Sequence, residues 1–170
     1  MLYFVYCADR PGSGLLRERL VEEHWAYMDG FAAELYARGP TLSDDGEAAT
    51  GSLHVVELPS DEAAHDFAVL EPNWRAGVYE SVVIYRFEDL LGRSMWEFAG
   101  PGGPRFLVTA GDVVNSADPN LIVLGRLRSL EDGHLVGVGA CVQAADAAAA
   151  GEMFAGGVVR PWREGGRPGN

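Results

Sequence analysis

Hydrophobic and polar residues recur along the first 98 residues with the periods of a mixed α and β domain. Runs rich in β-branched and aromatic residues predict strands, and an apolar period of three to four residues predicts helices. Ser60 before two acidic residues is typical of a helix N-terminus, and Pro72 predicts the end of that helix. The predicted elements are a strand at 2–8, a helix at 15–36, a short strand at 38–42, a strand at 52–58, a helix at 62–70 and a strand at 78–87. This order is the β-α-β-β-α-β plan of ferredoxin-like domains.

A run of glycine and proline at 99–105 predicts a linker, and a related pattern resumes after it. The later predicted elements are strands at 106–109, 121–127 and 135–142, a helix at 147–155 and a short strand at 158–160. Segments 55–61 and 140–146 align at an offset of 85, whereas the first strands of the two halves are offset by about 104. The difference, about 19 residues, is roughly the length of the first predicted helix.

The chain is therefore interpreted as a domain at 1–98, a linker at 99–105 and a degenerate second repeat at 106–170 that lacks the first helix. The alternative is a chance likeness between two α+β halves. A four-stranded sheet with helices on one face must cover its other face, usually with a second sheet. We expect an α+β fold in which two antiparallel sheets pack as an α+β barrel, with a cavity at their interface. Such a chain is an intrachain pseudo-dimer, and a homodimer remains the alternative.

His24 lies on the apolar face of the first predicted helix. Counted from Leu20, apolar residues stand at offsets of 7, 8, 11 and 15, and His24 stands at the missing offset of 4. The imidazole is therefore directed toward the interior, where burial and neighbouring charges can move its pKa across neutral pH. The alternative is a core histidine that only satisfies a backbone carbonyl group.

Composition narrows the classes of partner. The chain has 170 residues and a net charge of −12, and all 13 of its basic residues are arginine. Nucleic acids and anionic membrane surfaces are bound by clustered basic residues, so we expect neither as a partner. No apolar run approaches the roughly 20 residues that span a bilayer, and the N-terminus lacks the basic start of a secretory signal. We expect a cytoplasmic, bacterial protein whose partners are small molecules or other proteins.

No metal or cofactor motif is present in the sequence. The two cysteines, Cys7 and Cys141, lie far apart and are best explained as small core residues. The four histidines show no metal-binding spacing, and proline interrupts the glycines near residue 100, which removes an N–H group that a phosphate loop needs. We therefore expect neither a metal nor a cofactor.

Several segments together resemble the YCII-related domain family. They are MLYFVYCADRPGS at the start, the helix that carries His24, Gly-Pro at 39–40, TGSLHVVELPSDEAA at 50–64 and EPNWRAGVYESVVIYRF at 71–87. The ordered set covers about residues 1–98 and is more specific than any single motif. The family occurs as single and tandem domains and is similar to the dimeric α+β barrels.

The resemblance implies a histidine–carboxylate pair. His24 stands at the family's histidine position, and Glu71 stands where the family has an aspartate, so the carboxylate is longer by one methylene group. The family includes a dechlorinase of a hydroxylated aromatic compound, which implies lyase or hydrolase chemistry on aromatic or halogenated compounds. In such a pair the carboxylate orients the imidazole and stabilises the imidazolium ion that forms on proton abstraction. Glu71 is expected at a helix C-terminus, where few backbone donors are free.

Other side chains are candidates for contacts with a substrate. Arg10 and Ser13 follow the first strand and could hold a carboxylate or phenolate. Tyr3 and Tyr79 could supply hydroxyl groups, and Trp74 could stack on an aromatic ring. Each has a structural alternative: a solvated arginine with a helix cap, half-buried tyrosines and a tryptophan that closes one end of the barrel. The pattern does not decide whether His54 faces a cavity or solvent.

The most specific hypothesis is a cofactor-independent enzyme in which His24 and Glu71 carry out acid–base chemistry of the lyase, hydrolase or isomerase type. Its substrate would be a small molecule, aromatic or from secondary metabolism. One alternative is a non-catalytic module that binds a small ligand or another protein. A second is an oxygenase of the antibiotic-monooxygenase type. Because such folds support many chemistries, the reaction itself rests on analogy.

Overall fold

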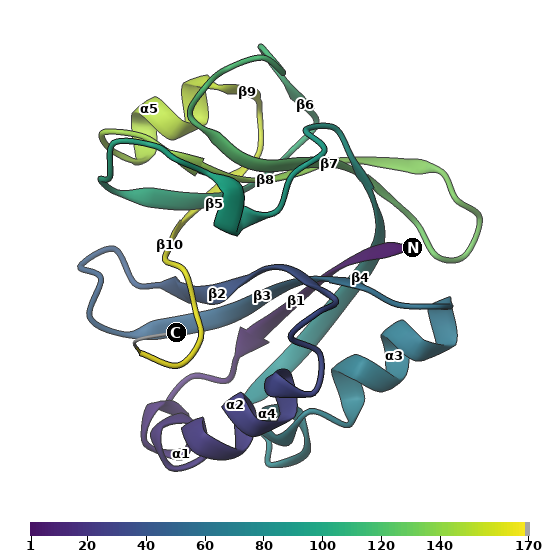
Figure 1. The fold of residues 1–170 in the computed structure, drawn as a ribbon. Coiled ribbons are helices and arrows are strands. Elements are labelled where there is room, and N and C mark those ends of the chain that lie inside the picture. The colour runs from purple at the N-terminus through teal and green to yellow at the C-terminus, as the bar shows by residue number, and fades with distance from the viewer. Residues whose placement is uncertain (169–170) are drawn as a thin grey trace.

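A computed structural model describes residues 1–168 (Figure 1). The first half contains β1 (Leu2–Asp9), α1 (Gly14–Arg19), α2 (Val21–Asp29), β2 (Leu35–Leu42), β3 (Ala49–Glu57), α3 (Asp61–Val69), α4 (Pro72–Arg75) and β4 (Tyr79–Asp89). The short helix η1 (Met95–Glu97) follows β4. The second half contains β5 (Arg105–Ala110), β6 (Asp112–Val113), β7 (Leu121–Arg128), β8 (Leu135–Gln143), α5 (Ala147–Glu152), β9 (Phe154–Ala155) and β10 (Val158–Trp162). No helix in this part of the chain is long and apolar enough to cross a membrane.

Eight strands close into a barrel in the order β1-β3-β2-β10-β5-β8-β7-β4. All neighbouring strands pair antiparallel, so the predicted α+β barrel is confirmed. The two halves use the same strand order, β2-β3-β1-β4 in the first and β7-β8-β5-β10 in the second. The halves join where β4 pairs with β7 and where Trp162 of β10 pairs with Thr41 of β2. One chain therefore supplies both sheets of the barrel.

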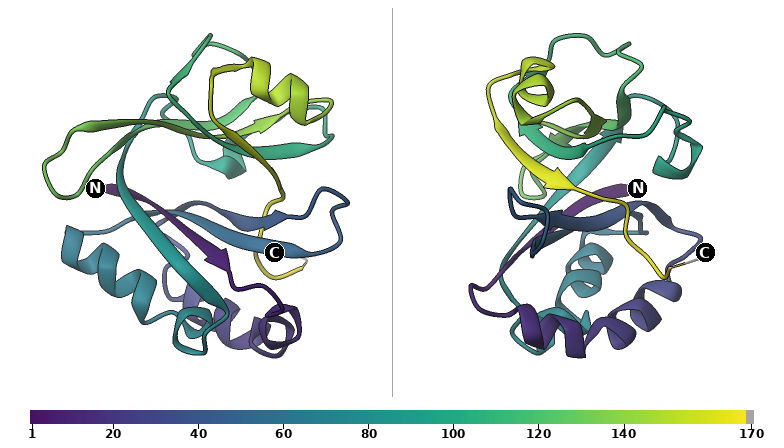
Figure 2. Two further views of the ribbon diagram at one scale, coloured as in Figure 1. Left: turned by 180° about the vertical axis from the view of Figure 1, so that it is seen from behind. Right: turned by 90° about the vertical axis from the view of Figure 1, so that its left-hand side faces the viewer.

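Side chains alternate between the two faces of the first sheet. On β3, Leu53 and Val55 face the barrel interior, where they pack with residues of the second sheet such as Leu107 and Ile122. Val56 faces the other way and packs with Met28 of α2. Helices α1 to α4 cover this outer face, while α5 lies on the far side of the second sheet (Figures 1 and 2). His54 therefore lies on the helix-covered side of the sheet.

The first predicted helix, 15–36, is too long. A break at Leu20 divides it into α1 and α2, and α2 ends at Asp29. Residues from Leu35 onward belong to β2, which pairs with β3 from the Leu35–Val56 pair onward. The strand begins earlier than the predicted residue 38 because backbone pairing with β3 outweighs the helical apolar period.

Pro72 begins a helix, whereas the sequence pattern predicted that it ends one. It occupies the first turn of α4, where its missing N–H group costs nothing. Glu71 is the N-cap of this helix, so the expectation that it lies at a helix C-terminus is wrong. Ser60 caps α3 as predicted, through a hydrogen bond from the Ala63 N–H group (3.1 Å).

The second half follows the predicted strands but differs at its helix. Residues 147–152 are helical, whereas Phe154 and Ala155 form β9, which pairs with β6. Between β5 and β7 the chain has β6 and a loop, where the first half has α1 and α2 between β1 and β2. The helix caps Ser60 and Asp146 stand 86 positions apart, one more than the sequence alignment gave. Cys7 and Cys141 are buried and free, as expected.

Candidate active site

His24 and Glu71 meet on the helix-covered face of the first sheet. His24 lies in the middle of α2, and its Nδ1 atom makes a short hydrogen bond with Oε1 of Glu71. The Glu71 side chain is only 3% exposed and that of His24 is 12% exposed. The second Glu71 oxygen accepts the backbone N–H of Trp74 at 3.2 Å. Glu71 is thus fixed between its own helix N-terminus and the imidazole.

This hydrogen bond defines the role of each imidazole nitrogen. A carboxylate only accepts hydrogen bonds, so Nδ1 carries the proton and donates it to Glu71. In the neutral ring Nε2 is then an acceptor, and it has no hydrogen-bond partner among residues 1–168. The arrangement is that of a base held in one tautomer by a carboxylate.

A cavity of about 360 Å³ opens beside His24. Helix α2 forms one wall through His24 and Trp25, and strands β2 and β3 form the floor. The last described residues of the chain, 163–168, form the opposite side and are called the C-terminal strap below. The lining residues are Arg17, Val21, His24, Trp25, Arg38, Gly39, Pro40, Ala49, Ser52, His54, Asn73, Arg163, Glu164, Gly165, Gly166 and Pro168.

His54 lies on the cavity floor close to His24. The two rings are 5.7 Å apart, and the edge of His54 also meets the Phe67 ring. Burial, reinforced by the nearby His24, Arg38 and Arg17, lowers the pKa of His54 well below its ordinary value. His54 is therefore neutral at physiological pH. The strand pattern left its orientation open, and the structure directs it to the cavity.

A polar network supports the floor. Arg17 donates to Ser52 Oγ at 2.7 Å and pairs with Asp9 at 2.7 Å. The Tyr79 hydroxyl donates to Ser52 Oγ at 3.0 Å and accepts from Asn73 Nδ2 at 3.2 Å. Burial raises the pKa of the Tyr79 phenol, so this hydroxyl stays protonated. Tyr79 thus lies behind the cavity lining and does not contact its interior.

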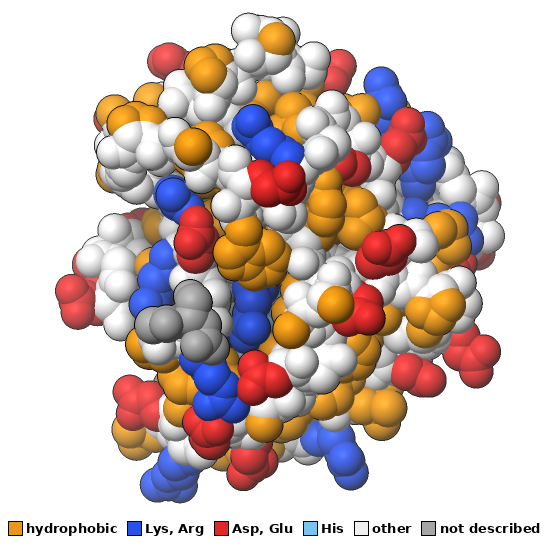
Figure 3. Space-filling view, in the orientation of Figure 1, with side chains coloured by type: hydrophobic (Ala, Val, Ile, Leu, Met, Phe, Trp, Pro, Cys, Tyr) orange, Lys and Arg blue, Asp and Glu red, His pale blue; other side chains and the backbone are white. Residues whose placement is uncertain are grey.

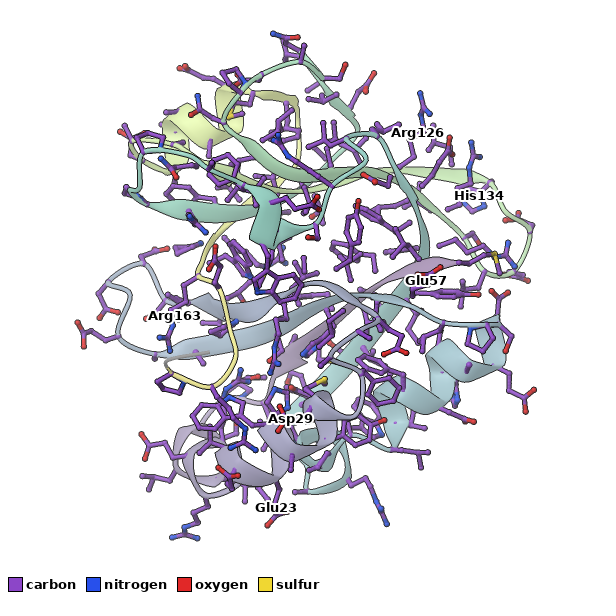
Figure 4. All side chains as sticks on the ribbon, in the orientation of Figure 1. Glu23, Asp29, Glu57, Arg126, His134 and Arg163 are labelled. Atoms are coloured by element: carbon purple, nitrogen blue, oxygen red, sulfur yellow. The ribbon has the colours of Figure 1, made fainter. Side chains whose placement is uncertain are left out.

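The C-terminal strap is attached to both sides of the cavity. Its backbone N–H groups at Arg163 and Gly165 donate to the carbonyl groups of Pro40 (3.3 Å) and Arg38 (3.0 Å). Arg167 pairs with Glu22 (2.7 Å) and Asp29 (2.9 Å) of α2. Its guanidinium also lies over the Trp25 ring, 5.6 Å from the centroid. Figure 4 shows Arg163 on this segment and Asp29 at the end of α2.

Four of the predicted substrate contacts lie elsewhere. Tyr3 is fully buried, and its hydroxyl donates to Asp61 at 2.7 Å. Arg10 is exposed and donates to the Gly77 carbonyl, while Ser13 only begins α1 and makes no side-chain cap. Trp74 packs against the apolar core and donates its backbone N–H group to Glu71. None of the four lines the cavity.

Arg38, Ser52, Asn73 and the C-terminal strap line the cavity but were not singled out from the sequence. Asn73 carries a weak signal, because it stands two positions after Glu71 in the segment that resembles the family. Arg38 and the strap carry no sequence signal, since strand pairing alone brings them beside α2.

The expected cavity between the two sheets is a separate one. A space of about 500 Å³ lies at one end of the barrel between β1 and β4 on one side and β5 and β8 on the other. It contains Tyr6, Tyr85 and Arg160 but neither His24 nor Glu71. Within residues 1–168 no group of three His, Cys, Asp or Glu side chains is arranged to hold a metal ion.

Comparisons with known proteins identify the family of the first half of the chain. The sequence model of the YCII-related domain matches residues 1–88. An uncharacterised protein of Haemophilus influenzae is 30% identical over 97 residues, which are 53% of this chain and 99% of that protein.

Two solved structures are similar in fold. One is the 5-chloro-2-hydroxyhydroquinone dehydrochlorinase TftG of Burkholderia phenoliruptrix, in complex with 2,5-dihydroxybenzoquinone. It is 30% identical, with a TM-score of 0.51, and covers 55% of this chain and 100% of its own. The other is a candidate monooxygenase from Lactobacillus acidophilus, with a TM-score of 0.52 over 95% of this chain and 92% of its own. At 8% identity this second likeness concerns the fold alone.

Proposed function

The chain belongs to the YCII-related domain family, and we propose that it is a cofactor-independent enzyme in which His24 is the general base and Glu71 orients it. The observation that carries the proposal is the buried His24–Glu71 pair at the edge of a cavity large enough for a single-ring compound. A histidine that only filled a core would need no carboxylate partner and no cavity beside its ring.

The proposed step is a proton transfer. Nε2 of His24 takes a proton from a carbon or hydroxyl group of the substrate, and Glu71 stabilises the imidazolium ion that forms. In the lyase form, the electron pair of the broken bond becomes a new double bond, and the leaving group departs with its own bonding pair. The proton then passes from His24 to the leaving group or to water. No oxidant or reductant is consumed, so the step needs no redox cofactor.

Lyase chemistry on an aromatic substrate is the form that we favour among the three. TftG is a dehydrochlorinase of a chlorinated hydroquinone, and its whole length is covered at 30% identity. Hydrolase chemistry would use the same base on water, and isomerase chemistry would return the proton to another carbon. All three predict that activity depends on His24.

We further propose that residues 106–170 are a diverged second copy of the domain without the first helix. The shared strand order supports this, as do the caps Ser60 and Asp146 at equivalent places in the two halves. In this proposal the second copy completes the barrel and supplies the C-terminal strap, while the first copy carries the proposed base and its carboxylate partner.

The test begins with a thermal-shift screen of phenols, small organic acids and halogenated aromatics against wild type, His24→Gln and His134→Gln. His134 is a matched control because it also bonds to a carboxylate, Asp132, but is 62% exposed. Compounds that stabilise the wild type are then assayed for turnover. We expect His24→Gln to lower kcat by about 10²–10⁴-fold and His134→Gln to leave it unchanged.

Two outcomes would reject the proposal. Ligand binding without turnover of any bound compound, together with tolerance of His24→Gln, would indicate a non-catalytic binding module. Oxygen uptake with a phenolic substrate would indicate an oxygenase.

A further inference from the structure

Arg38 is a buried cation on the cavity floor. It lies on β2, is only 8% exposed and lines the same cavity as His24 and His54. Burial lowers the pKa of its guanidinium, and no side-chain hydrogen bond or ion pair engages it within residues 1–168. A buried charge is costly unless a partner compensates it, so a bound anion would stabilise an arginine in this position.

The carboxylates around the cavity are engaged elsewhere. Glu71 accepts from His24 and from the Trp74 N–H group. Asp9 is paired with Arg17, and Glu164 of the C-terminal strap is paired with Arg105. The nearby Asp29 raises the pKa of Arg38, but its ion pair is with Arg167. Arg38 is thus the one buried arginine lining this cavity that makes no ion pair among the described residues.

The C-terminal strap lies beside the Arg38 guanidinium. At Gly166 an added Cβ atom would be in van der Waals contact with Cζ, at 3.8 Å, so the absence of a side chain there leaves room next to the cation. Arginine side chains also gather on this face between the two layers of the fold (Figure 3). A cationic cleft on a protein of net charge −12 favours anions locally while the rest of the surface repels them.

We propose that Arg38 is the substrate-anchoring residue of this site and that the substrate is a single-ring organic anion, a carboxylate or a phenolate. The role of Arg38 in a reaction rests on the proposed function, whereas the binding of an anion by Arg38 does not. The guanidinium would donate two parallel hydrogen bonds to a carboxylate, or hydrogen bonds converging on the single oxygen of a phenolate, which fixes the ring relative to Nε2 of His24. Neutral His54 would add a hydrogen-bonding group without a competing charge. Arg10 and Ser13, to which the sequence assigned this role, lie outside the cavity.

The experiment measures the binding of benzoate and 4-nitrophenolate by titration calorimetry at about pH 8, with benzamide and 4-nitroanisole as neutral analogues. The proteins are wild type, Arg38→Gln, Arg38→Lys and Arg163→Gln. Arg163 is the matched control, because it lines the same cavity but is exposed on the strap. The two anions show whether the site takes a carboxylate, a phenolate or both.

We expect Arg38→Gln to weaken binding of the anions by about 10–100-fold, since hydrogen bonds to charged groups are lost. Arg163→Gln should weaken it by less than about 3-fold, as for a solvent-screened charge. Arg38→Lys keeps the charge and should retain part of the affinity, which separates loss of the anchor from misfolding. The neutral analogues should bind all four proteins equally.

The anchor is rejected if the anions bind wild type no better than their neutral analogues, or if both glutamine variants have equal effects. His24→Gln separates this proposal from the proposed function. Anion binding that depends on Arg38, with no turnover of any compound, would support the anchor and reject the enzyme. Turnover of a neutral substrate that depends on His24 but not on Arg38 would support the enzyme and reject the anchor.

Discussion

Each half of the molecule contains a histidine hydrogen-bonded to a carboxylate, but only the pair of the first half is buried beside a cavity. In the first half, His24 and Glu71 are 12% and 3% exposed and border a cavity. In the second half, His134 and Asp132 are joined at 2.6 Å on a turn, where both side chains are 62% exposed. The pairing of residue types is therefore not what makes a site. The first pair differs from the second in its burial and in the cavity beside it.

The difference follows from one connection in each half. Between β1 and β2 the chain forms α1 and α2, which cover the sheet, carry His24 and form a wall of the cavity. Between β5 and β7 it forms only β6 and a loop. The second half instead contributes β10, which closes the barrel, and the C-terminal strap, which reaches across to α2 (Figure 2).

The largest expected effect separates the two histidine–carboxylate pairs. In Glu71→Gln the side-chain amide can donate to Nδ1 of His24, so the ring is held with its proton on Nε2 and ceases to be a base. We expect kcat to fall by about 10²–10⁴-fold, as when the histidine of a Ser-His-Asp triad is held in the wrong tautomer. Asp132→Asn makes the same change in the exposed pair and should leave kcat unchanged. Equal kcat values for both variants would contradict the assignment.

A second contrast uses two glycines at which an added side chain would clash to a similar degree. Gly39 on β2 has φ of +154° and Gly137 on β8 has φ of +155°. An added Cβ would lie 1.9 Å from the Arg163 carbonyl oxygen at Gly39 and 2.2 Å from the Ala110 oxygen at Gly137. Each substitution by alanine should lower the free energy of unfolding by about 1–3 kcal/mol, measured by denaturant unfolding.

The two alanine variants should differ in ligand binding. Gly39→Ala forces the C-terminal strap away from the cavity and should weaken ligand binding as well as stability. Gly137→Ala lies in the second sheet and should affect stability alone. Equal ligand affinity in both folded variants would show that the strap plays no part in the site.

The burial of neutral His54 predicts a pH dependence of stability that arises in the first half. Its folded-state pKa lies below the unfolded value of about 6.5, so the unfolded chain binds more protons below that pH. The free energy of unfolding should fall by up to about 1.4 kcal/mol per pH unit as the pH drops from about 6.5 to 5. His54→Asn should flatten this slope, whereas His134→Gln should preserve it. If the free energy of unfolding of His54→Asn kept the same dependence on pH, other titrating groups would be its cause.

The smallest expected effect concerns the attachment of the strap to α2. Arg167→Ala removes two ion pairs with exposed carboxylates and the contact with the Trp25 ring. Such pairs contribute about 1 kcal/mol or less, so ligand affinity should fall by no more than about 5-fold, and less at high salt. Arg126→Ala, which removes an ion pair with Glu88 in the second half, should leave ligand affinity unchanged.

The sequence was informative where local pattern decides the structure. Strand periodicity predicted the barrel strands, and Ser60 predicted the start of α3. The helix at 15–36 was overextended because the apolar residues from Leu35 onward fit a helical period as well as a strand, and only pairing with β3 decides between them.

The site was only partly predictable for the same reason. His24 and Glu71 stand out through the family resemblance, and the structure brings them into contact. Arg38 reaches the cavity through the pairing of β2 with β3. The C-terminal strap reaches it through barrel closure across more than a hundred residues of sequence. No spacing rule along the chain encodes such contacts, whereas Arg10 and Ser13, which the sequence favours, do not line the cavity.

The most direct test of the central claim is the tautomer of His24, which requires no substrate. Long-range ¹H–¹⁵N spectra of the histidine side chains, recorded at about pH 8 and assigned with His24→Gln, report which ring nitrogen carries the proton. The account predicts a neutral His24 with its proton on Nδ1 and a free Nε2, together with loss of this preference in Glu71→Gln. A proton on Nε2, or an imidazolium ion with both nitrogens protonated, would contradict the assignment of His24 as the base.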